Sequence, residues 1–85
     1  MNVNIDCSAI CSREQLHLAF AEALSFPACY GNNLDALHDQ LTSLSGTIRL
    51  ENWEAAEAKL GKYGISAKKA ITHAALENET LIVIF

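Results

Sequence analysis

The chain has 85 residues, of which 51% are hydrophobic and 19% are charged. A chain of this length buries somewhat more than ~60% of its unfolded surface, which permits one folded domain, residues 1–85, but leaves little room for a deep substrate pocket. The net charge is −4 and the six Lys and Arg residues form no cluster, which argues against direct nucleic-acid binding and fits a basic partner better.

Membrane and export signals are not apparent in the sequence. No apolar run approaches the ~20 residues that span a bilayer, and residues 1–6 lack the basic region and apolar block of a signal peptide. We therefore expect a cytoplasmic protein without membrane contact. An odd number of cysteines argues against a disulfide framework. Cys7 and Cys11 have no second Cys/His pair to complete a zinc-finger pattern, so we expect small, buried or half-buried thiols.

The first part of the chain predicts a strand followed by a helix. Residues 2–6 alternate between polar and apolar side chains, as in a short strand. Ser12 and Gln15 have the spacing of a capping box that opens a helix. Pro27 disfavours helical geometry at the residue before it, so the helix should end near residue 25. The core-facing stripe of this helix is Leu16, Phe20 and Leu24.

A second helix and a second strand follow. Gly31 permits a turn, and either Asn32 or Asn33 can cap the helix. Gly46 ends this segment, and residues 47–50 alternate again as a strand. The buried stripe of the second helix consists of Leu34, Leu37, Leu41 and Leu44.

The last part of the chain predicts two helices and a final strand. Asn52 should cap a third helix that Gly64 ends, and Ser66 should cap a fourth helix. The continuous apolar run of residues 81–85 predicts a strand, residues 80–85, that is buried on both faces. The inner face of the third helix is Trp53, Ala56, Leu60 and Tyr63, and that of the fourth is Ala67, Ala70, Ile71, Ala74 and Ala75.

The order of these elements is β-α-α-β-α-α-β. Strands that are separated by helical crossovers pair in parallel, with right-handed connections. The sequence therefore predicts an α/β fold in which a three-stranded parallel sheet packs with about four helices.

Two aspartates, Asp35 and Asp39, lie four residues apart on the predicted second helix, a spacing at which like charges slightly destabilise an isolated helix. Steps of ~100° per residue place both nearly opposite the leucine stripe, with His38 between the two faces. They form either an acidic surface for a partner or an ordinary solvated face. A metal site that includes Cys29 and His38 is a third interpretation, because imidazole and carboxylate groups bind divalent ions.

The segment YGNNLDALHD, residues 30–39, preceded by Phe26-Pro27, resembles the signature of the barstar family, intracellular inhibitors of the ribonuclease barnase. The resemblance is strong over about residues 26–42, and it extends more loosely, through chain length and element order, over the whole chain. It implies an inhibitor that is monomeric when free, takes no cofactor, and binds a small, basic, extracellular, barnase-like ribonuclease.

The resemblance also implies roles for individual residues. The second helix and the turn before it would plug the basic active site of the ribonuclease. Asp39 would take the place of a substrate phosphate, and Asp35 would accept hydrogen bonds from the rim of the same site. Gly31 and Asn33 would shape the turn, while the side chains at 34 and 42 would flank the acid pair. The predicted partner-binding residues are Cys29, Tyr30, Gly31, Asn33, Leu34, Asp35, His38, Asp39 and Thr42.

Some positions depart from the family pattern. Family members often carry an aromatic residue at the position of Cys29 and a tryptophan at that of His38. Barstar has acidic residues after this helix and on its last helix, where this chain has the uncharged residues 43–46 and the region around His73. Fewer acids imply weaker steering, and hence a different or weaker partner of the same class. The alternative is an interaction module that binds a non-nuclease partner.

Enzyme chemistry is not indicated. No serine lies in a nucleophile elbow, no Cys–His pairing is visible from spacing, and the four glycines form no phosphate loop. We expect His17 and His73 at the surface or its rim, and Trp53 in the core. Because His38 lies beside two aspartates, we also expect partner binding to change between pH 5 and 8.

Overall fold

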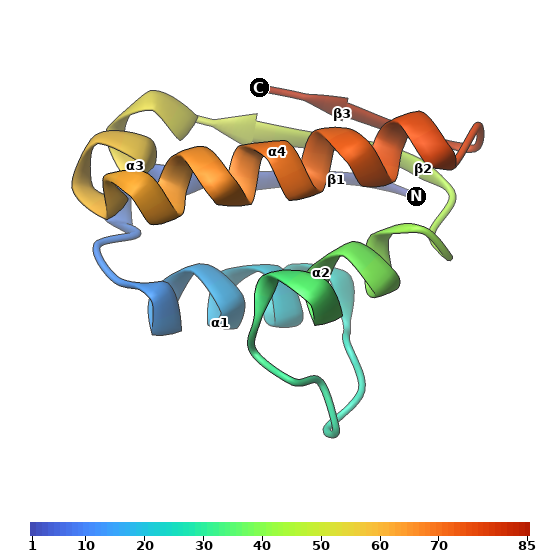
Figure 1. Cartoon of the computed structure of the whole chain (residues 1–85). Coiled ribbons are helices and arrows are strands. Elements are labelled where there is room, and N and C mark those ends of the chain that lie inside the picture. Colours follow the sequence, from blue (N-terminus) through green and yellow to red (C-terminus); the bar gives the residue numbers. More distant parts are fainter.

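Three parallel strands form the sheet of the computed structural model, which describes all residues from 1 to 85. They are β1 (Asn2–Asp6), β2 (Gly46–Glu51) and β3 (Leu81–Ile84), in the order β1-β2-β3. Val3 of β1 pairs with Ile48 of β2, which pairs with Val83 of β3. Two helices separate each strand from the next, apart from a short 3-10 helix, η1 (Cys7–Ala9), after β1 (Figure 1). The predicted α/β class and parallel sheet are therefore confirmed.

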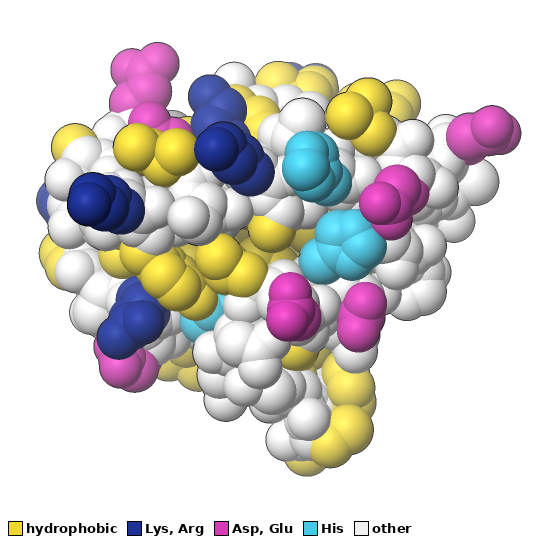
Figure 2. All heavy atoms as spheres, viewed as in Figure 1, with side chains coloured by type: hydrophobic (Ala, Val, Ile, Leu, Met, Phe, Trp, Pro, Cys, Tyr) yellow, Lys and Arg dark blue, Asp and Glu magenta, His cyan; other side chains and the backbone are white.

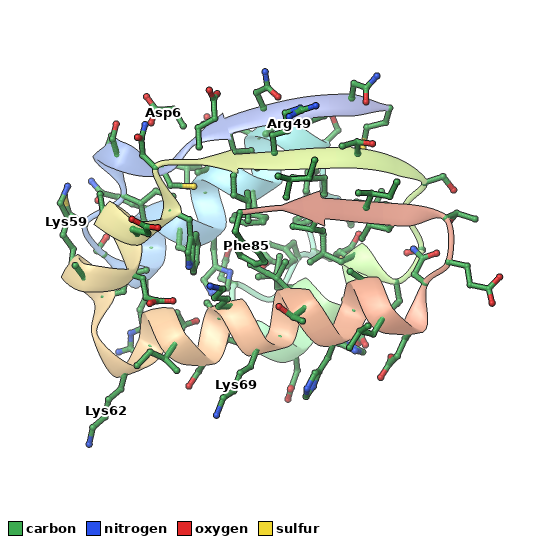
Figure 3. All side chains as sticks on the ribbon, turned by 90° about the horizontal axis from the view of Figure 1, so that it is seen from above. Asp6, Arg49, Lys59, Lys62, Lys69 and Phe85 are labelled. Atoms are coloured by element: carbon green, nitrogen blue, oxygen red, sulfur yellow. The ribbon has the colours of Figure 1, made fainter.

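The helices cover only one face of this sheet. They are α1 (Arg13–Leu24), α2 (Leu34–Leu41), α3 (Trp53–Leu60) and α4 (Lys62–Glu77). In Figure 1, α1 and α2 lie below the sheet, and α4 runs along the side of β3. No helix crosses the opposite face, where Arg49 lies exposed on β2 (Figure 3). The hydrophobic core fills the space between the sheet and the helices, and its largest fully buried side chains include Phe20, Leu16, Leu37, Leu41, Ile48, Leu50 and Ile71.

The prediction that the last strand is buried on both faces is wrong. In β3 the side chain of Leu81 is 4% exposed, whereas that of Ile82 is 57% exposed and Ile84 is also open to solvent. Alternate side chains of a strand point to opposite faces of the sheet. Because all helices lie on one side, every second residue of β3 faces water despite the apolar run.

The predicted boundary between the last two helices is also wrong. Helix α3 ends at Leu60, and Gly61, with φ +61°, separates it from α4. Gly64 does not end a helix but lies buried inside α4, where a Cβ atom would come within 2.8 Å of the Glu57 Cα. Ser66 lies in the middle of α4 and caps nothing. Gly64 is thus a site of close helix packing. In the sequence, such a glycine cannot be told from one that ends a helix.

The ends of the other helices follow local signals. Ser12 caps α1, since its hydroxyl accepts a hydrogen bond from the Gln15 backbone N–H at 3.2 Å. Asn52 precedes α3 as predicted, but its side chain donates to Asp6 Oδ1 at 3.0 Å and makes no cap hydrogen bond. Trp53 is buried in the core, as expected.

The three cysteines are free thiols. Cys7 is fully buried, and burial raises its pKa to about 11, so it remains protonated at neutral pH. Cys11 and Cys29 are exposed, which corrects the expectation of a half-buried thiol at position 11.

Candidate functional site

Helix α2 presents the two aspartates outward on a short, well-anchored element. Leu37 and Leu41 are fully buried on its inner face, while Asp35 and Asp39 are exposed on the other side. At its N-terminus Asn33 accepts a hydrogen bond from the Ala36 backbone N–H at 2.8 Å. Asn33, and not Asn32, is therefore the cap of this helix. Eight residues form a helix that is marginal in isolation, so its stability comes from this packing and capping.

The C-terminal end of α2 is held by a residue from the connection between α4 and β3. The side-chain amide of Asn78 donates to the backbone carbonyls of Leu41, at 3.0 Å, and Leu44, at 2.6 Å. Thr42, a predicted partner-binding residue, uses its hydroxyl on the Asp39 carbonyl at 2.8 Å. Carbonyls at a helix end lack partners within the helix. Asn78 therefore ties α2 to the end of α4.

His38 joins the acidic face of α2 to α4. Its Nε2 lies 3.0 Å from Oε2 of Glu77, and its Nδ1 lies 3.7 Å from Oδ1 of Asp39. In Figure 2, Asp, Glu and His side chains gather over α2 and the neighbouring part of α4, while Lys and Arg side chains lie toward the other end of α4. We call Asp35, His38, Asp39 and Glu77 the acidic surface. Glu77 could not be recognised from the sequence, because nothing in the spacing shows that it packs beside α2.

The connection between α1 and α2, residues 25–33, forms a turn that projects away from the sheet (Figure 1). We call it the recognition turn. Cys29 and Gly31 are exposed in it, as a partner contact requires, and Leu34 behind it is half-buried. Tyr30 points inward instead: it is 8% exposed, and its ring centroid lies 4.7 Å from that of Phe26. Of the predicted partner-binding residues, Tyr30 is the one that the fold buries.

The expectation that His17 is a surface residue is wrong. His17 is 1% exposed, and its Nδ1 and Nε2 lie 2.6 Å and 2.7 Å from the hydroxyl groups of Tyr30 and Tyr63. Burial lowers the pKa of His17, while the charge of Glu14 opposes this shift. Burial also raises the pKa of Tyr30 to about 12. His17, Tyr30 and Tyr63 lie far apart in the sequence, so its pattern does not indicate this buried polar cluster. By contrast, His73 is exposed, as expected.

A groove lies beside the acidic surface, between α1, the recognition turn and the start of α4. Asp35 and Asn32 line one side, Arg13 and Leu18 line the other, and Tyr63 also contributes. The Arg13 guanidinium lies 5.2 Å from the centre of the Tyr63 ring. No three His, Cys, Asp or Glu side chains are arranged to hold a metal ion, so Cys29, Asp35, His38 and Asp39 do not converge as a metal site requires.

The fold and this site together define a class: small α/β proteins that present an acidic helix and its preceding turn at the surface. No helix has the length and apolar character needed to cross a membrane. A family model described as Barstar (barnase inhibitor) matches residues 1–84, and the chain therefore belongs to the Barstar family. It is also 40% identical over 76 residues to "Putative ribonuclease inhibitor YrdF" of Bacillus subtilis (strain 168), with 84% of each chain covered.

Proposed function

We propose that this protein inhibits a small, basic, secreted microbial ribonuclease by covering its active site with α2 and the recognition turn. The observation that carries this proposal is the exposure of Asp35 and Asp39 on a helix whose other face is fixed in the core. Because the chain belongs to a family described as Barstar (barnase inhibitor), the partner we propose is a ribonuclease.

The chemistry follows from the charges. A ribonuclease binds the phosphate of RNA through cationic and hydrogen-bond-donating side chains, and a carboxylate offers acceptor oxygens to the same groups. Asp39 takes the place of the phosphate, and Asp35 accepts hydrogen bonds from the rim. Because α2 is held at both ends by Asn33 and Asn78, little conformational entropy is lost when the two aspartates bind.

The residues around the acid pair complete the surface. Cys29, Gly31 and Asn33 contact the partner from the recognition turn, while Leu34 and Thr42 flank the aspartates. His38 lies between Asp39 and Glu77, with its ring nitrogens 3.7 Å and 3.0 Å from their carboxylate oxygens. With a net charge of −4, the protein steers a cationic partner only modestly. We infer a partner that is less basic, or more weakly bound, than the most tightly held enzymes of this class.

The protein acts as a single domain and as a monomer before it meets its partner. It works in the cytoplasm, where it keeps a ribonuclease harmless before export. One inhibitor molecule blocks one enzyme molecule, without cofactor and without chemistry of its own.

The test is a titration of ribonuclease activity. Purified protein is added to the ribonuclease encoded nearest to its gene, with barnase as a second enzyme. We expect activity to fall to zero near one equivalent. Asp39→Ala removes charge-assisted hydrogen bonds and should raise the inhibition constant at least ~100-fold, which corresponds to about 3 kcal/mol.

A matched control separates the local effect from net charge. Glu54 is exposed on α3, so Glu54→Gln changes the net charge by the same amount without touching α2. It should leave the inhibition constant within about threefold, as expected for a remote surface charge. Wild-type protein without effect on either enzyme, or Asp39→Ala that inhibits as well as wild type, would refute the proposed mechanism.

A further inference from the structure

A chain of hydrogen bonds crosses the interior from α4 to the recognition turn. The Tyr63 hydroxyl contacts His17 Nε2 at 2.7 Å, and His17 Nδ1 contacts the Tyr30 hydroxyl at 2.6 Å. His17 lies on α1, so three parts of the chain meet at one imidazole ring. The distances are short for hydrogen bonds, and both partners of the ring lie largely out of solvent.

This chain supplies the side-chain hydrogen bond that attaches the recognition turn, whose Tyr30 ring also packs in the hydrophobic core. Residues 25–33 contain no helix or strand. The other side-chain hydrogen bonds within the turn come from Asn33, and they reach only Gly31 and the start of α2. The hydroxyl of Tyr30 thus makes the one side-chain hydrogen bond that joins the turn to the body of the molecule beyond α2. Its contact with the Phe26 ring stays within the turn.

A neutral imidazole satisfies every donor in this chain of hydrogen bonds. A neutral ring has one N–H donor and one acceptor nitrogen, so one tyrosine hydroxyl accepts from it and the other donates to it. A protonated ring has two donors, and the hydroxyl that donated must turn its proton away, into a region with little water. A buried donor without a partner is unfavourable. Protonation would therefore keep both contacts but reverse one of them, and it would leave one hydroxyl proton without an acceptor.

The surroundings of His17 do not offset this effect strongly. Glu14 on α1 favours the charged ring, but burial outweighs it. Arg13 lies over the Tyr63 ring and disfavours a further positive charge nearby, and Asp35 lines the groove from the side of α2.

We propose that His17 is a positioning residue for partner binding: through the Tyr30 hydroxyl it holds the recognition turn in its binding geometry. This inference rests on the proposed function, because it assigns to the turn a role in contacting the ribonuclease. It predicts that loss of this hydrogen bond weakens the inhibitor at a distance from the surface that touches the partner. A histidine that only fills the core would affect stability and leave the turn unchanged.

Two matched substitutions separate these roles. Tyr30→Phe and Tyr63→Phe each remove one hydroxyl from one nitrogen of the same ring, so both should lower the free energy of unfolding to a similar extent. Only Tyr30 belongs to the recognition turn. The backbone N–H of Tyr30 donates to the Pro27 carbonyl at 2.9 Å and reports the order of the turn. We therefore expect hydrogen–deuterium exchange at this amide to rise about tenfold in Tyr30→Phe, the factor for one lost hydrogen bond, and to stay near wild type in Tyr63→Phe.

Exchange is compared in the free protein at pH 7.5, and exchange in β2 serves as the internal reference because it should stay slow in all variants. Equal protection of the turn in Tyr30→Phe and Tyr63→Phe would overturn the proposal.

Partner binding supplies the second readout, with barnase as the probe at pH 7.5. We expect Tyr30→Phe to weaken binding about tenfold and Tyr63→Phe to change it less than about twofold. Equal losses in both variants would mean that His17 acts through stability alone. Failure of the wild type to bind barnase would count against the proposed function. The exchange experiment needs no partner, so it would still decide whether His17 holds the recognition turn.

Discussion

The substitution Asn78→Asp tests how the acidic helix is held in place. It changes one amide group into a carboxylate of the same shape. The side-chain amide of Asn78 donates to the carbonyls of Leu41 and Leu44, at the C-terminal end of α2. A carboxylate cannot donate a hydrogen bond, so both carbonyls lose the bond from this side chain. Longer bonds remain, from the Thr80 hydroxyl to the Leu44 carbonyl at 3.2 Å and from the Leu44 N–H to the Leu41 carbonyl at 3.3 Å. The acceptor role of the side chain, toward the backbone N–H of Thr80 at 3.1 Å, is retained.

The expected decrease in the free energy of unfolding can be estimated from these contacts. Two hydrogen bonds contribute about 1 kcal/mol each. A negative charge at the C-terminal end of a helix is unfavourable by about 0.5 kcal/mol. The free energy of unfolding should therefore fall by about 2.5 kcal/mol. For a domain of this size, that corresponds to a decrease in Tm of roughly 10–20 °C.

The assay is urea denaturation followed by the fluorescence of Trp53, the only tryptophan, which is buried. Asn33→Asp is the matched control, because it makes the same chemical change at the other end of the same helix. There an aspartate can still accept the hydrogen bond from Ala36, and it loses only the exposed donation to the Gly31 carbonyl at 3.2 Å. Because its charge favours the helix N-terminus and offsets this loss, stability should change by less than ~0.5 kcal/mol. Equal effects at both ends, or a loss below ~0.5 kcal/mol in Asn78→Asp, would refute the reasoning.

Three further predictions concern packing and pH. Gly64→Ala places a methyl group 2.8 Å from the Glu57 Cα. Although alanine has the better helix propensity, the substitution should lower the free energy of unfolding in urea by about 1–2 kcal/mol. A urea midpoint at or above that of the wild type would contradict close packing. Because burial lowers the pKa of His17 below its ordinary 6.5, the unfolded state binds the proton first. The free energy of unfolding should thus fall as pH drops below about 6.5, by at most ~1.4 kcal/mol per pH unit, and His17→Gln should remove this slope in urea titrations. His38→Gln replaces the imidazole beside Glu77 with a side chain that does not ionise, so it should flatten the expected change in ribonuclease affinity between pH 5 and 8; an unaltered profile would exclude His38 as its source.

Much of the fold could be predicted from local signals. Ser12 and Asn33 cap their helices because a side-chain oxygen at that position accepts from the helix backbone nearby. The leucine stripe of α2 places Leu37 and Leu41 in the core. The alternation of residues 2–6 and 47–50 marks two strands, and crossovers through helices require them to be parallel.

The errors arose where tertiary packing overrides a local pattern. A glycine signals both the end of a helix and a close approach between helices, and Gly64 is of the second kind. The apolar run of β3 indicates a strand but not how many faces of the sheet are covered. His17 and Glu77 were missed as parts of the site, because their contacts join residues that are 13 or more positions apart. The exposure of Asp35 and Asp39 needed only the helical period.

Competition with a nucleotide would test most directly the claim that α2 occupies the phosphate site of a ribonuclease. The apparent dissociation constant of the complex with barnase is measured at increasing concentrations of a mononucleotide with a 3′-phosphate, which binds the active site of the enzyme. If Asp39 takes the place of the phosphate, the apparent constant rises in direct proportion to nucleotide concentration once the site is saturated, and the Glu54→Gln protein behaves like wild type. An apparent constant that stays the same at saturating nucleotide would contradict the claim.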